Sequence, residues 1–253
     1  RVPRCYFAAW GEARTDYICV LEDLEAAGCR FPKSVPEHAR ERGGEFIETL
    51  ARLHAHFWED ARFGAELAWV PPAMRGALGA QLVSQAHARF AGELPPVFAE
   101  LCRLYVEHHE RVCDLWDEGG STLIHGDCHT GNQFLDGDRV GLYDWAVLSR
   151  SPGIRDVAMF MANSCPPDVR RAEQDRWLRA YRQGLQGGGV DAPGLDVLGL
   201  RLRLAALYGW VAATATAAVG DRWQPLEVGM TAMRGATQAC AELETLEAFR
   251  AAL

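Results

Sequence analysis

One short segment of the chain gathers four side chains that can bind metals or move protons. The segment, LIHGDCHTGNQF, spans residues 123–134 and carries His125, Asp127, His129 and Asn132 directly after an apolar run. Three kinds of site use such residues: a metal centre, the nucleophile loop of a hydrolase and a loop for phosphoryl transfer. The rest of the sequence has to distinguish between them.

A zinc centre is the first possibility. His125, Asp127 and His129 alternate, so on a β-strand they would share one face and could chelate zinc. However, Gly126 and Gly131 indicate a turn rather than a strand, and no further histidine cluster follows downstream.

A hydrolase nucleophile is the second possibility. The chain has no G-x-S-x-G motif, and Cys128 lies between Asp127 and His129 with no helix start beside it. Neither pattern indicates an activated nucleophile.

Phosphoryl transfer explains more of these residues at once. It needs a carboxylate that orients an attacking hydroxyl and accepts its proton, and oxygen ligands that hold Mg²⁺ on the nucleotide phosphates. Asp127 is suited to the first role. Asn132 follows on the same loop, and a predicted hairpin returns the chain so that Asp144, at the end of VGLYD, faces Asn132. The sequence therefore favours a phosphoryl-transfer site.

The elements that position this loop can be predicted from local patterns. Residues 4–10 and 16–24 are rich in aromatic and β-branched residues and predict strands. A helix is predicted from Pro36, with Ser34 near its start. Its apolar face repeats at spacings of three and four and consists of Phe46, Leu50, Leu53 and Phe57.

Further helices are predicted for residues 75–91 and 96–117 and through most of the chain after the loop. Short strands are predicted around the loop, in the segments TLIH, QFL and RVGLYDW. The chain is thus expected to be a β fragment followed by a mostly helical body with a small β insert, and the insert carries the chemistry.

Composition limits the partners and the compartment. The formal net charge is −8 and the pI is near 5.5, which argues against a nucleic-acid partner or an anionic membrane surface. The apolar stretch 204–219 is shorter than a membrane span and predicts a buried core helix. The N-terminus does not resemble a signal peptide. We expect reduced, buried thiols and a cytoplasmic location, because no C-x-x-C pair occurs among the cysteines at positions 5, 19, 29, 102, 113, 128, 165 and 240.

The motifs HGDCHTGN and LYDW resemble H-G-D-x-H-x-x-N and I-D-W of the aminoglycoside phosphotransferase and choline kinase superfamily, the small-molecule relatives of protein kinases. The resemblance is greatest to its ecdysteroid-kinase-like branch, and it extends from near residue 1 to about residue 190. Other segments that carry it are VLEDL (20–24), LARLHAHFW (50–58), PGIRDVAMF (152–160) and PPDVRRAEQDRWLRAYRQGL (166–185).

This resemblance implies an enzyme that moves the γ-phosphoryl group of ATP to a hydroxyl of a small molecule. Asp127 is then the catalytic base, and Asn132 and Asp144 are the Mg²⁺ ligands. His125 and His129 mainly brace the loop.

The resemblance also implies a nucleotide site and a support for the loop. In the hinge segment VLEDL, the Glu22 carbonyl and the Leu24 amide bond the adenine edge, and Phe134 forms the apolar floor beneath the base. Asp156 pins the catalytic loop through backbone amides. His54 is expected to be a packing residue, with support of the loop as the alternative.

The expected fold class is α+β and protein-kinase-like. Residues 1–27 are interpreted as a remnant of the β N-terminal lobe, and residues 28–253 as the helical C-terminal lobe. The phosphate-covering loop and the strand lysine of such kinases should precede residue 4, and the only lysine, Lys33, is badly placed for that role. We therefore expect impaired activity from this chain, and a non-catalytic kinase-like binding module is the alternative.

Overall fold

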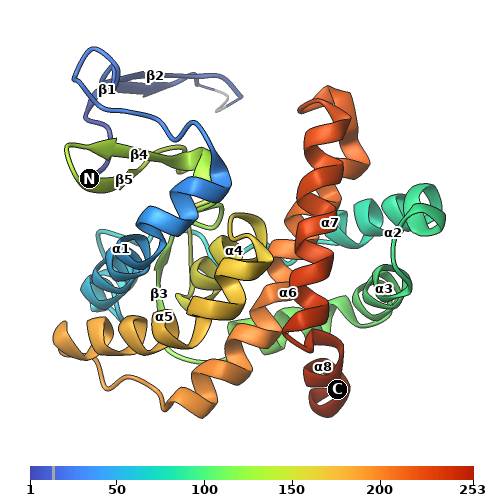
Figure 1. Cartoon of the computed structure of the whole chain (residues 1–253). Helices are drawn as coiled ribbons and strands as arrows, with labels where there is room; N and C mark the ends of the chain where they lie inside the picture. Colours follow the sequence, from blue (N-terminus) through green and yellow to red (C-terminus); the bar gives the residue numbers. More distant parts are fainter. Residues whose placement is uncertain (13–14) are drawn as a thin grey trace.

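A β-hairpin opens the chain in the computed structural model, which describes residues 1–12 and 15–253. Strands β1 (Cys5–Trp10) and β2 (Tyr17–Leu21) pair antiparallel and confirm the predicted β fragment. Almost all of their residues are exposed, and the hairpin projects from the helical body (Figure 1).

Helix α1 (Val35–His56) follows the hairpin and begins where the sequence predicts. The Ser34 hydroxyl caps it by accepting a hydrogen bond from the Glu37 amide, and Pro36 lies in its first turn. The predicted apolar face points into the core: Phe46 and Leu50 are fully buried. Helix α1 lies against α5 (Figure 1).

The rest of the body is built mainly from helices, and α6 runs through its middle between α4 and α7 (Figure 1). Helices α2 and α3 confirm the two predicted before the loop. The helices are α2 (Leu78–Phe90), α3 (Pro96–Asp117), α4 (Ile154–Asn163), α5 (Pro167–Gly187), α6 (Leu195–Val219), α7 (Leu226–Glu242) and α8 (Thr245–Ala252). Single 3₁₀ turns lie at Ala61–Gly64, Ala91–Glu93, Thr130–Asn132 and Gly220–Arg222.

Two small antiparallel sheets flank the loop of residues 125–132. Strand β3 (Ser121–Ile124) leads into the loop and pairs with β6 (Ser149–Pro152). Strand β4 (Gln133–Asp136) leaves the loop and pairs with β5 (Arg139–Leu142), so the predicted hairpin is confirmed. Strand β6 was not predicted, because its sequence SRSP has no strand pattern and becomes extended only by pairing with β3.

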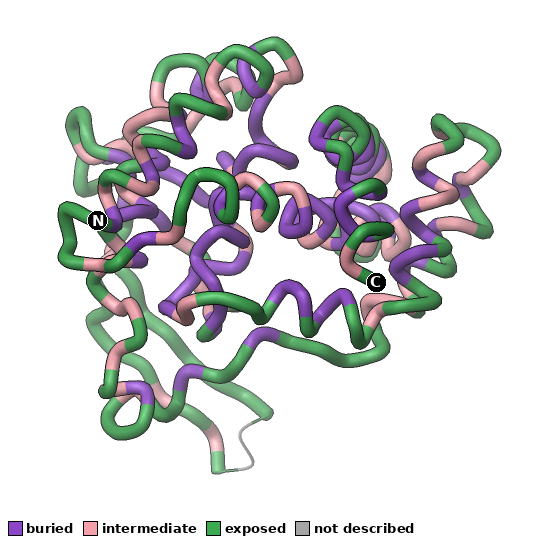
Figure 2. The backbone as a smooth tube through the Cα atoms, turned by 90° about the horizontal axis from the view of Figure 1, so that it is seen from below, coloured by how far each residue is buried: buried purple, intermediate pink, exposed green. Residues whose placement is uncertain are grey.

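Helix α6 is the buried core helix that the sequence predicts. It meets the length and composition test for a membrane span over Leu195–Arg222, with a mean hydropathy of 1.3 in its most apolar window. Just over half of that window, 56%, is buried inside the protein, where the helix packs against α2, α4 and α7. Figure 2 shows buried residues concentrated in the helical body, whereas the N-terminal hairpin is exposed.

The prediction that the cysteines are buried is wrong for two of them. Cys5 and Cys19 lie on the hairpin and are exposed, because no other described element covers either face of this two-stranded sheet. The remaining six are buried, and all eight are free thiols, as the sequence predicts.

Candidate active site

One buried carboxylate holds the loop between β3 and β4 in place. Asp156, in the first turn of α4, is completely buried and accepts hydrogen bonds from the backbone amides of His125 at 2.8 Å and Gly126 at 2.9 Å. The predicted support of the loop by Asp156 is thus present in the structure.

His54 of α1 supports this carboxylate from the other side. Its Nε2 lies 3.3 Å from Asp156 Oδ2, and its Nδ1 lies 2.9 Å from the Tyr181 hydroxyl. Burial by itself raises the pKa of Asp156, but the hydrogen bond and charge of His54, together with His125 and the Gly126 amide, outweigh burial and hold that pKa below its ordinary value. The alternative role considered for His54, support of the loop, is the one that the structure shows.

Gly126 allows the tight turn between His125 and Asp127. Its φ is +84°, and a Cβ at this position would lie 2.6 Å from the backbone oxygen of Val147. Only glycine fits both the left-handed backbone and the close approach of the second chain segment.

Both loop histidines form hydrogen bonds to the backbone around them. His125 Nδ1 accepts a hydrogen bond from the Asp127 amide at 3.2 Å, so its Nε2 donates to the Tyr143 carbonyl at 2.9 Å. His129 Nδ1 accepts from the Gly131 amide at 2.9 Å. Both side chains therefore brace the loop, in agreement with the bracing role expected of them.

The loop brings the predicted base and one predicted metal ligand into contact. The Asn132 side-chain amide donates to the Asp127 carbonyl at 2.8 Å and lies 3.3 Å from the Asp127 carboxylate. The Asp127 side chain is 40% exposed, so it remains open to a substrate. The donor end of the Asn132 amide is used by Asp127, which leaves the oxygen end as an acceptor.

Asp144 follows β5 and comes directly after Tyr143, a residue that is bonded to the loop. The Tyr143 amide donates to the Asn132 carbonyl at 3.1 Å, so the residue before Asp144 is bonded to the loop. Asp144 is exposed and has a positive φ of 58°, which marks a turn of the chain two residues after the end of β5. The Asn132 and Asp144 side chains offer oxygen atoms, the ligand type that Mg²⁺ prefers.

A zinc centre does not fit the loop. Within residues 1–12 and 15–253, no three His, Cys, Asp or Glu side chains are grouped closely enough to hold a metal ion. In addition, His125 already uses both ring nitrogens in bonds to the loop and to Tyr143.

The hinge segment is fastened to the start of the chain. The Glu22 amide donates to the Arg4 carbonyl at 2.8 Å, and the Glu22 carboxylate accepts from the Arg4 amide at 2.9 Å and from the Arg1 guanidinium at 2.6 Å. The hydrogen bond from Arg1 is the largest influence that lowers the pKa of Glu22. The Glu22 side chain is therefore structural, and the role predicted for this residue concerns its carbonyl alone.

The predicted hinge and the predicted adenine floor lie in one small apolar cluster. Leu24, Cys29 and Phe134 are buried together, and Tyr143 packs against them. Phe134 is fully buried, and the guanidinium of Arg1 lies over its ring at 5.7 Å from the centroid. The close approach of β5 to this ring requires Gly141, because a Cβ there would lie 2.3 Å from Phe134.

A third support of the loop, which the sequence did not predict, comes from α6. The Tyr208 hydroxyl donates to the Gly126 carbonyl at 2.7 Å. Arg155 lies over the rings of Trp116 and Tyr208, 5.3 Å from each centroid, and pairs with Asp117 at 3.1 Å. The position of Arg155 beside Asp156 was a signal that could have been used, whereas Tyr208 lies in an apolar helix that carries no motif.

Side chains from α1 and α4 complete the support. The Gln133 side chain donates to the Cys128 carbonyl at 3.2 Å and is itself bonded to His38 of α1 at 2.9 Å. The Thr130 amide donates to the Ser164 hydroxyl at 2.8 Å. The loop is thus held by hydrogen bonds that lead to α1, α4 and α6. Asp127 projects from this supported backbone.

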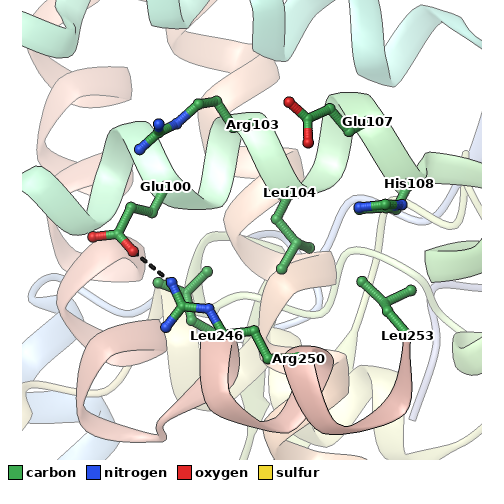
Figure 3. Close-up of a pocket in the computed structure, with 8 residues that line it drawn as sticks. All are labelled: Glu100, Arg103, Leu104, Glu107, His108, Leu246, Arg250 and Leu253. Atoms are coloured by element: carbon green, nitrogen blue, oxygen red, sulfur yellow. Dashed lines mark hydrogen bonds and ion pairs between the residues drawn. The ribbon is translucent and has the colours of Figure 1, made fainter.

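A separate hollow of about 400 Å³ lies between α3 and α8 (Figure 3). Glu100 and Arg250 point toward one another from the two helices and pair at 2.6 Å, and Leu104 and Leu246 form its apolar wall. It contains none of the predicted site residues.

The chain belongs to the phosphotransferase enzyme family, whose sequence pattern matches residues 2–196. No curated protein sequence matches the chain. Among solved structures, choline kinase from Cryptosporidium parvum superposes with a TM-score of 0.56 at 9% identity, over 98% of this chain and 75% of that one. This likeness shows a kinase-like fold, in agreement with the predicted α+β class.

Two further structures are similar at lower scores. An aminoglycoside phosphotransferase from Streptomyces rimosus gives a TM-score of 0.44 at 19% identity, over 83% of this chain and 74% of that one. A macrolide 2'-phosphotransferase from Brachybacterium faecium gives 0.46 at 19% identity, over 93% and 73%. The likeness to the ecdysteroid-kinase-like branch and the division into residues 1–27 and 28–253 stay predictions.

Proposed function

We propose that the chain is a cytoplasmic, ATP- and Mg²⁺-dependent phosphotransferase that moves the γ-phosphoryl group to a hydroxyl of a small molecule. The observation that carries this proposal is the contact of Asp127 with Asn132 on a loop that Asp156 holds through two backbone amides. Family membership supports the reaction type. The contact supports the choice of Asp127 and Asn132 as residues of the site.

Asp127 is the proposed catalytic base. Its carboxylate is partly exposed and is oriented by the Asn132 side chain, so it can accept a hydrogen bond from an acceptor hydroxyl and take its proton as the phosphoryl group transfers. Positioning of this kind needs a stiff backbone, which the bonds of Asp156 and Tyr208 to the loop provide.

Asn132 and Asp144 are the proposed Mg²⁺ ligands. The set fits the ion, because both side chains offer oxygen and the donor end of the Asn132 amide is held by the Asp127 carbonyl. Bound Mg²⁺ would neutralise charge on the nucleotide phosphates.

The nucleotide base is proposed to bind beside the cluster of Leu24 and Phe134, with the Glu22 carbonyl and the Leu24 amide at its edge. The support is that these residues, more than a hundred positions apart in the sequence, form one apolar unit next to the loop. The acceptor is proposed to be a small-molecule alcohol, the class that the names of the similar solved structures suggest.

A pair of variants tests the enzyme against the non-catalytic binding module. ATP consumption is measured with Mg²⁺ and pooled hydroxyl compounds that include aminoglycosides, macrolides and choline, and nucleotide binding is measured in parallel. The proposal expects Asp127→Asn to lower turnover by about 10²- to 10⁴-fold while it keeps nucleotide binding. The control is Asp138→Asn, at an aspartate that is 92% exposed in the turn between β4 and β5. It should leave turnover and nucleotide binding unchanged. Nucleotide binding without turnover in the unaltered chain would favour the binding module.

A further inference from the structure

The N-terminal hairpin holds two thiols close together on one face. Cys19 and Leu21 alternate on β2 and share a face, and Cys5 lies opposite Leu21 on β1. The Sγ atoms of Cys5 and Cys19 are 3.9 Å apart. Both residues are exposed, whereas the other six cysteines are buried.

We propose that Cys5 and Cys19 form a reversible dithiol–disulfide pair that reacts with small-molecule disulfides of the glutathione type. One thiolate attacks the small disulfide, forms a mixed disulfide and releases one small thiolate. The second thiolate attacks the sulfur of the protein cysteine in that mixed disulfide, forms the Cys5–Cys19 bond and releases the second small thiol. The two protein thiols are oxidised, the small disulfide is reduced to two thiols, and the two protein protons pass to those thiols or to solvent. This inference does not rest on the proposed phosphotransferase activity.

The geometry favours closure of the pair within one chain. The sulfur atoms are already in contact, so the bond needs a side-chain rotation and a small adjustment of the strands. The strand pairing is irregular between Cys5 and Phe7, and this irregularity is the place where β1 can adjust.

The surroundings of Cys19 influence the pH at which its thiol reacts. Desolvation raises the pKa of the Cys19 thiol, and the hydrogen bond and charge of Cys5 raise it further. Reaction should therefore quicken as pH rises, because the thiolate is the nucleophile. The buried cysteines compete poorly, since burial raises the pKa of Cys102 to about 12 and excludes reagents.

The bridge would lie at the hinge end of the hairpin. Arg4 and Glu22 directly flank the Cys5 and Leu21 positions, and the Glu22 amide is bonded to the Arg4 carbonyl at 2.8 Å. A covalent link beside this bond should slow its opening.

The test uses glutathione redox buffers with the whole chain, followed by alkylation and tryptic mapping. Cys5 lies in tryptic peptide 5–14 and Cys19 in peptide 15–30, which also contains Cys29. A Cys29→Ala background makes the assignment unique. The expected result is a link between the two peptides in the monomeric chain, loss of the two rapidly reacting thiols, reversal by dithiothreitol and slower hydrogen exchange of the Glu22 amide.

Single-cysteine variants complete the test. Cys5→Ser and Cys19→Ser should each stop at one glutathione adduct, since the second attack has no partner. Separate adducts on both residues of the unaltered chain, with no link between the peptides, would overturn the proposal. Disulfide-linked dimers in place of the internal bond would overturn it as well.

Discussion

Replacement of Asp156 by asparagine should destabilise the protein, because it removes hydrogen bonds to the loop between β3 and β4. The carboxylate accepts the Gly126 amide on Oδ1 and the His125 amide on Oδ2, and His54 also lies against Oδ2. A carboxamide has one acceptor oxygen. If the asparagine oxygen keeps the bonds from the His125 amide and His54, the asparagine NH₂ group faces the Gly126 amide. The NH₂ group and the Gly126 amide are then two buried donors without an acceptor.

The magnitude follows from these contacts. One hydrogen bond to a charged group is worth about 1.5–3 kcal/mol, and buried unpaired donors cost about 1–3 kcal/mol. Asp156 is fully buried, so solvent does not screen the loss. We expect the free energy of unfolding to fall by about 3–5 kcal/mol, within the range for removal of one partner from a buried charged network.

Urea denaturation of the unaltered chain and the variant measures this difference. The matched control is Asp168→Asn, because the Asp168 side chain is 64% exposed and pairs with Arg40 on the surface. The control should lower the free energy of unfolding by less than about 1 kcal/mol. Equal destabilisation by the two substitutions would refute the reasoning that Asp156 anchors the loop.

Three further results are expected from the same network. The pKa of Asp156 lies below its ordinary value of 3.8, so its contribution to stability is present above pH 3.8 and is lost as pH falls through the lowered pKa. The difference in unfolding free energy between the unaltered chain and Asp156→Asn should therefore narrow below pH 3.8 in acid titrations. A difference that stays constant would contradict this. Gly126→Ala should lower the unfolding free energy by about 2–4 kcal/mol, because strain at positive φ adds to the clash with Val147. The control Gly137→Ala, also at positive φ but with open space around it, should lower the unfolding free energy by only about 1–2 kcal/mol. Equal losses in urea denaturation would show that the clash contributes nothing. Tyr208→Phe should cost about 0.5–1.5 kcal/mol and speed hydrogen exchange in the loop, and unchanged exchange would show that the hydroxyl does not hold it.

The sequence predicts the elements whose signals are local. Ser34 with Pro36 marks the start of α1, and the repeat that contains Phe46 and Leu50 identifies its buried face. The loop between β3 and β4 could be predicted because its motif is contiguous and glycine marks the turn.

Features that depend on distant pairing could not be predicted. Strand β6 is extended because β3 lies beside it, and its own residues do not favour a strand. Tyr208 contacts Gly126 across 82 positions from within an apolar helix, where a tyrosine is indistinguishable from a packing residue. The exposure of Cys5 and Cys19 depends on which elements cover the β1–β2 hairpin. The composition of the two strands does not predict which elements pack against them.

Calorimetric titration with ATP, with and without Mg²⁺, tests directly whether Asn132 and Asp144 hold a metal ion on a bound nucleotide. The unaltered chain is compared with Asp144→Ala and with the control Asp138→Ala. Asp138 is 92% exposed and lies in the turn between β4 and β5. We expect Mg²⁺-dependent binding that Asp144→Ala loses and Asp138→Ala keeps. Mg²⁺-dependent binding that survives in Asp144→Ala would contradict the assignment of the metal site, and binding that does not respond to Mg²⁺ would contradict the proposed phosphotransferase site.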